Sequence, residues 1–180
     1  MKKIVLLALV AACGDNTAPI SYTNPSGGKL RLVSTKTTAK SVTLAFEVGD
    51  APLTGYSTGF DLPIDTSKVT LASFTPGTVL DPGPAPIAAT ATISTDGPLG
   101  GQLVAAQSAK ATSTTADVAL AAGAVLFTFE LDLVQDAPKG IVFDGTDPAF
   151  HLPSGGLRDR AGNTVVDAPD VAIGKLSVNR

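Results

Sequence analysis

The sequence predicts an all-β fold, an antiparallel β-sandwich of about nine strands with one short helical turn. The strongest evidence is the stretch 124–134, where apolar residues occupy alternate positions: Val125, Phe127, Phe129, Leu131 and Leu133. Polar residues lie between them, as expected for a sheet that packs on a core from one side. The 18 glycines, the 13 prolines and the absence of a long helical period indicate many short strands joined by turns.

The first twelve residues are typical of a secretory signal peptide. Two lysines precede the apolar run 4–10, which is too short to span a bilayer, and two alanines follow it. The ending Leu9-Val10-Ala11-Ala12-Cys13 resembles the lipobox of bacterial lipoproteins, in which the cysteine is acylated and becomes the mature N-terminus. This resemblance implies a lipid anchor at Cys13 and a location in the cell envelope, on the outer membrane or the cell surface. An ordinary export signal with an incidental cysteine is the alternative.

Residues 13–28 are expected to form a flexible tether, because they are rich in Asn, Thr, Pro, Ser and Gly and show almost no apolar periodicity. Tyr22 would then be a solvated linker residue. Residues 29–180 have the length of one domain with a sizeable core. Removal of residues 1–12 leaves 11 basic and 16 acidic residues, a net charge of −5, without a cluster of Lys or Arg. Nucleic acid is therefore excluded as a partner.

Alternating apolar residues bounded by turn-forming residues place the strands of the first half of the domain. Pro63 lies near the end of one of them and implies an edge strand, a bulge or the strand's end. Residues 81–86 contain three prolines, which cannot donate ladder hydrogen bonds, so they form a surface loop. The strands expected in this half are 30–36, 41–48, 56–64 and 68–74.

The second half begins with two weaker strands rich in alanine and threonine, 87–94 and 101–107. Thr114 or Thr115 would cap a helical turn through 116–122, which Gly123 would end. After the central strand 124–134, we expect a strand at 141–144, irregular chain at 147–156, a hairpin of 157–159 with 164–166, and a last strand at 171–178.

Two segments resemble the cohesin family. Residues 59–77 look like the cohesin segment in which an alternating strand ends in Asp-Pro-x-Val/Leu and continues through a second strand to a Pro-Gly turn. Residues 123–131, followed by Ala137-Pro138-Lys139-Gly140, are similar to the family's penultimate long strand and its small-Pro-x-Gly loop. Together with 157–178, the resemblance covers about residues 29–179. It implies a nine-stranded, cohesin-like jelly-roll sandwich, a fold shared with some carbohydrate-binding modules.

The resemblance also implies a binding module for a protein partner. Cohesins bind dockerins, small calcium-loaded helical modules, through a sheet face with polar residues on the third strand and on the strand before the helical turn. Here the third strand reads Ser57-Thr58-Gly59 where many cohesins have Asn-x-Asp, and the other strand ends in Gln107-Ser108-Ala109 without an acidic residue. The candidate contacts are Ser57, Gln102 and Gln107, with plain solvated sheet positions as the alternative.

The sequence lacks the residue groupings typical of catalysis, so we expect no enzymatic activity and no cofactor. The only histidine, His151, lies near Ser154 in a Pro-Ser-Gly-Gly loop, but no nucleophile motif surrounds the pair. Asp144 and Asp147 are weak candidates for calcium ligands, because the segment between them lacks the regular ligand spacing of a known calcium loop.

Two other classes of function stay open. A carbohydrate-binding module would bind a polysaccharide through exposed aromatic rings, but the chain has no Trp and two Tyr. Tyr56 is the one candidate in the domain, and its phase with Phe60 and Leu62 suggests the core. A structural envelope lipoprotein without a specific ligand is the other class.

Overall fold

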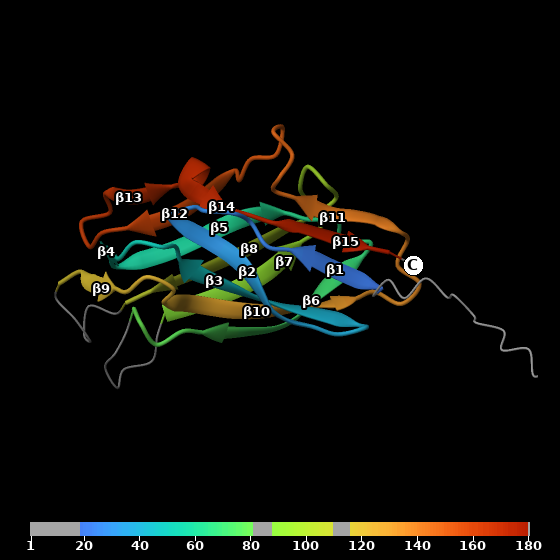
Figure 1. Cartoon of the computed structure of the whole chain (residues 1–180), viewed down its shortest axis with the longest axis horizontal. Coiled ribbons are helices and arrows are strands. Elements are labelled where there is room, and N and C mark those ends of the chain that lie inside the picture. The colour runs from blue at the N-terminus through green and yellow to red at the C-terminus, as the bar shows by residue number, and fades with distance from the viewer. Residues whose placement is uncertain (1–18, 81–87, 110–115, 180) are drawn as a thin grey trace, which may run out of the picture.

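Two five-stranded sheets pack face to face in the computed structural model, which describes residues 19–80, 88–109 and 116–179 (Figure 1). Sheet I has the strand order β14 (Val171–Ala172), β2 (Leu30–Thr37), β3 (Ser41–Val48), β10 (Val125–Leu133) and β6 (Val69–Pro76). Sheet II has the order β13 (Thr164–Asp167), β12 (Ser154–Arg158), β5 (Ser57–Pro63), β8 (Gln102–Ser108) and β7 (Ala88–Ser94). The predicted β-sandwich is confirmed.

Two smaller sheets lie at opposite ends of the long axis of the sandwich (Figure 1). At one end, β15 (Lys175–Val178) pairs with β1 (Ile20–Thr23) on one side and β11 (Gly140–Asp144) on the other. At the other end, β4 (Leu53–Gly55) pairs with β9 (Val118–Leu120). The described residues contain no helix long and apolar enough to cross a membrane.

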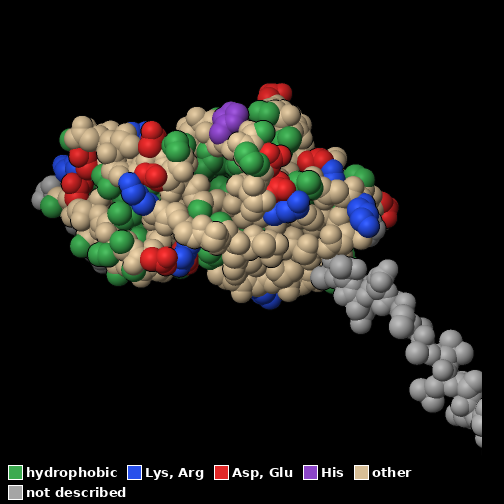
Figure 2. Space-filling view, turned by 45° about the horizontal axis from the view of Figure 1, so that its top comes forward, with side chains coloured by type: hydrophobic (Ala, Val, Ile, Leu, Met, Phe, Trp, Pro, Cys, Tyr) green, Lys and Arg blue, Asp and Glu red, His purple; other side chains and the backbone are tan. Residues whose placement is uncertain are grey.

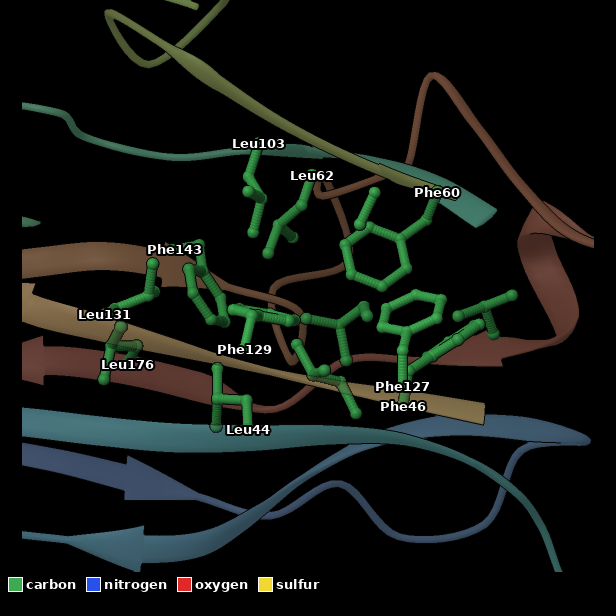
Figure 3. Packing of buried hydrophobic residues seen from close by; sticks show 14 of the residues in the cluster. Leu44, Phe46, Phe60, Leu62, Leu103, Phe127, Phe129, Leu131, Phe143 and Leu176 are labelled. Atoms are coloured by element: carbon green, nitrogen blue, oxygen red, sulfur yellow. The ribbon is translucent and has the colours of Figure 1, made fainter. Parts of the chain in front are cut away.

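The core is built around the phenylalanines of β10, as the sequence predicts. Phe127 and Phe129 are 0% and 1% exposed. The ring of Phe60, from β5 in sheet II, lies 5.7 Å from the ring of Phe127 and 4.9 Å from that of Phe46 on β3 (Figure 3). These contacts join the two sheets, and each large aromatic side chain buried in this way contributes about 1.5–3 kcal/mol to stability.

The predicted positions of the main strands are confirmed, and β3 has the predicted bounds. Pro63 is the last residue of β5, so it marks the end of the strand rather than an edge strand or a bulge. The predicted hairpin is the antiparallel pair of β12 and β13. The alternation in β10 fails at Leu126, which is fully buried, because the register with β3 shifts between Val125 and Phe127.

The helical turn predicted at 116–122 is wrong in its position. Residues 118–120 form β9, because Leu120 enters the core at 1% exposure and pairs with Leu53 of β4. The proposed caps Thr114 and Thr115 lie outside the described residues. The helical turn in the described part of the chain is the 3-10 helix η1 (Ala168–Asp170), where Pro169 fixes a helical φ near the start.

The N-terminal side of the domain also differs from the prediction. Part of the expected tether is β1, which pairs with β15 and places Ile20 in the core at 0% exposure. Tyr22 is not a solvated linker residue, because its hydroxyl donates to the Leu32 carbonyl at 2.7 Å and accepts from the Gly174 amide at 3.0 Å. The folded domain therefore begins before Lys29.

The last predicted strand is divided into two. Val171 and Ala172 form β14, which pairs in parallel with β2, so the sandwich is not purely antiparallel. The chain then leaves sheet I, and β15 pairs with β1 and β11. Gly174 lies at this crossing, where a Cβ atom would lie 2.8 Å from the ring and hydroxyl of Tyr22. The absent side chain lets Tyr22 pack against the crossing.

Candidate functional site

The outward side of sheet II, called here the outer face, is formed mainly by small side chains. Residues of β5 and β8 alternate between buried and half-exposed, and the register places Ser57 opposite Ser108 and Gly59 opposite Ala106. The neighbouring strands β7 and β12 add further small residues. The small outward-facing residues of these four strands include Ser57, Gly59, Ala88, Thr90, Ala106, Ser108, Ser154 and Gly156.

A shallow hollow of about 510 Å³ lies on the outer face. Residues of four strands line it, among them Gly59, Ala88, Ala106, Gly156 and Arg158. The hollow exists because glycine and alanine leave the middle of the sheet without large side chains, while Arg158 supplies the long side chain at its border.

Two of these glycines cannot be replaced without strain. Gly156 has a φ of +128°, and a Cβ atom there would collide with the carbonyl oxygen of Val166. A Cβ atom on Gly59 would lie 2.7 Å from the carbonyl oxygen of Ala105. Close backbone packing therefore keeps the floor of the hollow free of side chains.

Charged groups lie at both ends of this neutral surface. At one end, the Arg158 guanidinium donates to the Thr164 hydroxyl. At the other end, Asp61 accepts a hydrogen bond of 2.8 Å from the Ser154 hydroxyl. The arrangement can accept a protruding apolar side chain in the hollow and an acidic group beside Arg158.

No family model matches the sequence, and no curated protein matches it. A solved structure does match the fold: a chain in the crystal structure of a CaDoc0917–CaCohA2 cohesin complex at pH 5.5, with a TM-score of 0.51. The match covers 81% of this chain and 95% of the other, at 13% sequence identity. The domain has a cohesin-like fold. At this identity the likeness concerns the fold alone.

In the cohesin-like domain, the three predicted contacts do not share one face. Ser57 and Gln102 are half-exposed on the outer face. Gln107 points into the sandwich and is 1% exposed, and its amide binds both the amide nitrogen and the carbonyl oxygen of Gly77, at 3.1 and 2.7 Å. The prediction of Gln107 as a partner contact is wrong, because its side chain is buried and fully engaged. Its phase with Leu103 and Ala105 was the signal for this.

His151 and Ser154 have different partners in the cohesin-like domain. The Ser154 hydroxyl donates to Asp61, whereas Nδ1 of His151 lies 3.2 Å from the Ala149 carbonyl. His151, the one histidine in Figure 2, lies at the surface beside hydrophobic side chains. It borders a hollow of about 450 Å³ that is separate from the outer face and includes Leu99 and Ile141, which are 45% and 49% exposed.

The calcium candidates Asp144 and Asp147 serve turns. One carboxylate oxygen of Asp144 forms an ion pair of 2.8 Å with Lys175. The other oxygen accepts hydrogen bonds from the amide and the hydroxyl of Thr146. The hydrogen bond from Lys175, followed by that from Thr146, lowers the pKa of Asp144. Asp147 accepts from the Ala149 amide at 2.9 Å. In the described segments, no three His, Cys, Asp or Glu residues are grouped as a metal site.

Two further sequence candidates remain. Tyr56 is half-buried rather than a member of the core, and the Arg160 guanidinium lies 5.4 Å from its ring centroid. Cys13 and the predicted signal peptide lie outside the described residues. Sequence reasoning missed Ala106, Gly156 and Arg158, because only the pairing of β12, β5 and β8 brings these distant positions together.

Proposed function

We propose that this protein is a non-enzymatic protein-binding module that uses the outer face of sheet II, with a dockerin-type protein as its partner. The observation that carries the proposal is the hollow on the outer face of a cohesin-like fold, which small uncharged residues line except for Arg158 at its border. The structural neighbour comes from a CaDoc0917–CaCohA2 complex, which supports a protein as the class of ligand.

The chemistry of the outer face favours a partner with an apolar anchor. Buried anchors that fill pockets at the centre of an interface supply most of the binding energy, while the surrounding contacts exclude water. The hollow would accept such a side chain between Gly59, Ala106 and Gly156. Arg158 would then pair with a carboxylate of the partner, so the interface would depend on one charged residue in place of the acidic contacts on many cohesins.

The test is a binding measurement with dockerin-bearing proteins encoded in the same genome. Ala106→Trp would fill the hollow and should weaken binding at least about tenfold, or about 1.4 kcal/mol. Ala72→Trp is the matched control, because Ala72 is exposed on β6 of sheet I. The same affinity in both variants would contradict the outer face as the binding site. Absence of binding by every dockerin would contradict the partner class.

The absence of enzymatic activity needs its own test. Hydrolysis of a glycan or an ester by the purified protein, lost on His151→Ala, would contradict the proposal of a binding module. No hydrolysis is expected, because His151 and Ser154 engage different partners.

A lipid on Cys13 would hold the module on the membrane, since several acyl chains together bind almost irreversibly. The lipobox-like sequence ending at Cys13 supports this part of the proposal. The full chain should fractionate with membranes and incorporate labelled palmitate, and Cys13→Ser should lose both properties. The lipid anchor would be contradicted if the wild-type chain incorporated no label and if Cys13→Ser fractionated with membranes as the wild-type chain does.

A further inference from the structure

Within the part of the chain that the structure describes, one side of strand β7 has no ladder partner, although β6 of sheet I lies close to β7 without pairing with it. Strand β7 is the last strand of sheet II, and β8 is its ladder partner within the described residues. All seven residues, Ala88 to Ser94, pair with β8 without a register shift. The opposite side of a strand paired in this way carries a row of backbone N–H and C=O groups that can pair with a further strand.

In its own seven residues, β7 lacks the sequence features that usually protect an edge strand. It has no charged residue, no proline and no bulge. The other outer strands of the described part are different. Strand β6 has a register shift and ends at Pro76, β11 has a register shift and ends at Asp144, and β13 has four residues and ends at Asp167. Strands β1, β4, β9 and β14 have four residues or fewer.

The inward side chains of β7 are incompletely buried. Ala91 and Ile93 pack against the core but are only partly buried, while Thr90 and Thr92 are exposed on the outer face. A further strand beside β7 would complete the burial of Ala91 and Ile93, at about 25 cal/mol per Å² of apolar surface.

We propose that two copies of this chain pair through β7, antiparallel and related by a two-fold axis at Ala91. The sequence Ala-Ala-Thr-Ala-Thr-Ile-Ser is self-complementary about this residue. Thr90 then lies opposite Thr92 of the second copy on the outer face, and Ala89 lies opposite Ile93 on the inner side. No like charges meet, and threonine pairs across antiparallel strands are favourable.

Pairing of this kind joins the two copies of sheet II into one continuous sheet. The two outer faces would then lie side by side and point to the same side, so the dimer would bind two sites on one partner or on one surface with increased avidity. The pairing rests on the backbone edge of β7, whereas the proposed function rests on the hollow, which Ala88 and Thr90 of the same strand also line. Dimer formation by the free chain tests the pairing without any binding partner.

The register is tested by cysteine cross-linking in the full chain with Cys13→Ser, which has no other thiol. A mixture of Thr90→Cys chains and Thr92→Cys chains should form a disulfide-linked dimer under mild oxidation, because these positions face each other in the proposed pairing. Each variant alone should give at least about fivefold less dimer, because equal positions lie two residues out of register. Equal yields from all three samples, or no dimer in any, would overturn the register.

The association itself is tested by sedimentation velocity on the same Cys13→Ser chain. This chain should have the mass of a dimer, and Thr90→Lys with Thr92→Lys in one chain should be monomeric, because lysines then face each other. Mixing this variant with Thr90→Glu plus Thr92→Glu should restore the dimer, which a merely unfolded variant could not do. A monomeric Cys13→Ser chain, or a lysine variant that stays dimeric, would overturn the proposal.

Discussion

Gln107 joins the two sheets from inside the sandwich. It extends from β8 of sheet II, and its amide binds both backbone groups of Gly77, which follows β6 of sheet I. A buried amide in this position stabilises the fold only while both of its hydrogen bonds are made. Its role is therefore structural, because it ties β8 to the chain that follows β6.

Gln107→Leu should lower the free energy of unfolding by about 1–3 kcal/mol, because the Gly77 carbonyl loses a buried donor. Urea denaturation monitored by circular dichroism measures the change. Gln102→Leu is the matched control on the same strand, and its half-exposed position on the outer face predicts a change within about 0.5 kcal/mol. Equal stability of the two variants would show that the bonds to Gly77 do not stabilise the fold.

Asp144 makes the stability of the domain depend on pH in the acid range. Its ion pair with Lys175 and its bonds from Thr146 hold its pKa below the ordinary value of 3.8. Because the folded protein favours the charged form, this stabilisation is fully present above about pH 4 and is lost as the pH falls through the lower native pKa.

Asp144→Asn should therefore flatten the decrease in the free energy of unfolding between about pH 4 and pH 2. Lys175→Met should flatten the same interval, because it removes the largest cause of the lowered pKa. The double variant should add little to either change, since both act on one interaction. Urea titrations at a series of pH values measure the slopes, and unchanged slopes in both variants would refute the assignment.

Among the elements, β1 shows how a short strand escapes sequence analysis. Its four residues follow a stretch rich in polar and turn-forming residues, and one alternation of Ile20 with Tyr22 is too short to indicate a strand. Its place is set by distant partners, β15 along the edge and Leu32 beneath the Tyr22 hydroxyl. Burial raises the pKa of Tyr22, so its hydroxyl keeps the proton that it donates to Leu32.

Tyr22→Phe should destabilise the domain by about 1–3 kcal/mol, because the Leu32 carbonyl and the Gly174 amide both lose a partner. The amides of β1 and β15 should exchange hydrogen faster in this variant. Tyr56→Phe is the control, because Tyr56 contacts Arg160 through its ring, which the substitution leaves in place. A Tyr22→Phe variant as stable as the control would show that β1 is only weakly attached.

Long strands could be located from sequence because their alternation is local. In β3 and β10 seven or more residues repeat the pattern, so the phase of Phe46 and Phe127 could be read directly. Strand β9 has three residues, and its alternation of Val118 and Leu120 was hidden by alanines that also suit a helix. The pairing of the strands could not be read in this way, because it joins residues that are almost a hundred positions apart in the sequence, such as Gly59 and Gly156. The hollow on the outer face depends on this pairing.

At the scale of the whole molecule, both ends of the described chain lie at one end of the sandwich (Figure 1). The Asn179 amide donates to the Pro19 carbonyl at 2.9 Å, beside the pairing of β1 with β15. Five residues separate Pro19 from Cys13, which allows a reach of at most about 20 Å. An acylated Cys13 would therefore keep this end of the domain close to the membrane and direct β4 and β9 away from it.

This orientation predicts a difference in energy transfer to an acceptor in the lipid headgroups. If Cys13 is acylated as proposed, it has no free thiol, and a cysteine introduced elsewhere can be labelled alone. A donor on Lys139→Cys, next to the Gly140 that pairs with Val178, should transfer more efficiently than a donor on Thr54→Cys in β4 at the opposite end. The same two labels on detergent-solubilised protein give the baseline. Equal efficiencies on vesicles would contradict this orientation. They would mean that the long axis of the domain lies parallel to the membrane, or that the chain is not anchored through Cys13 by a tether of about 20 Å.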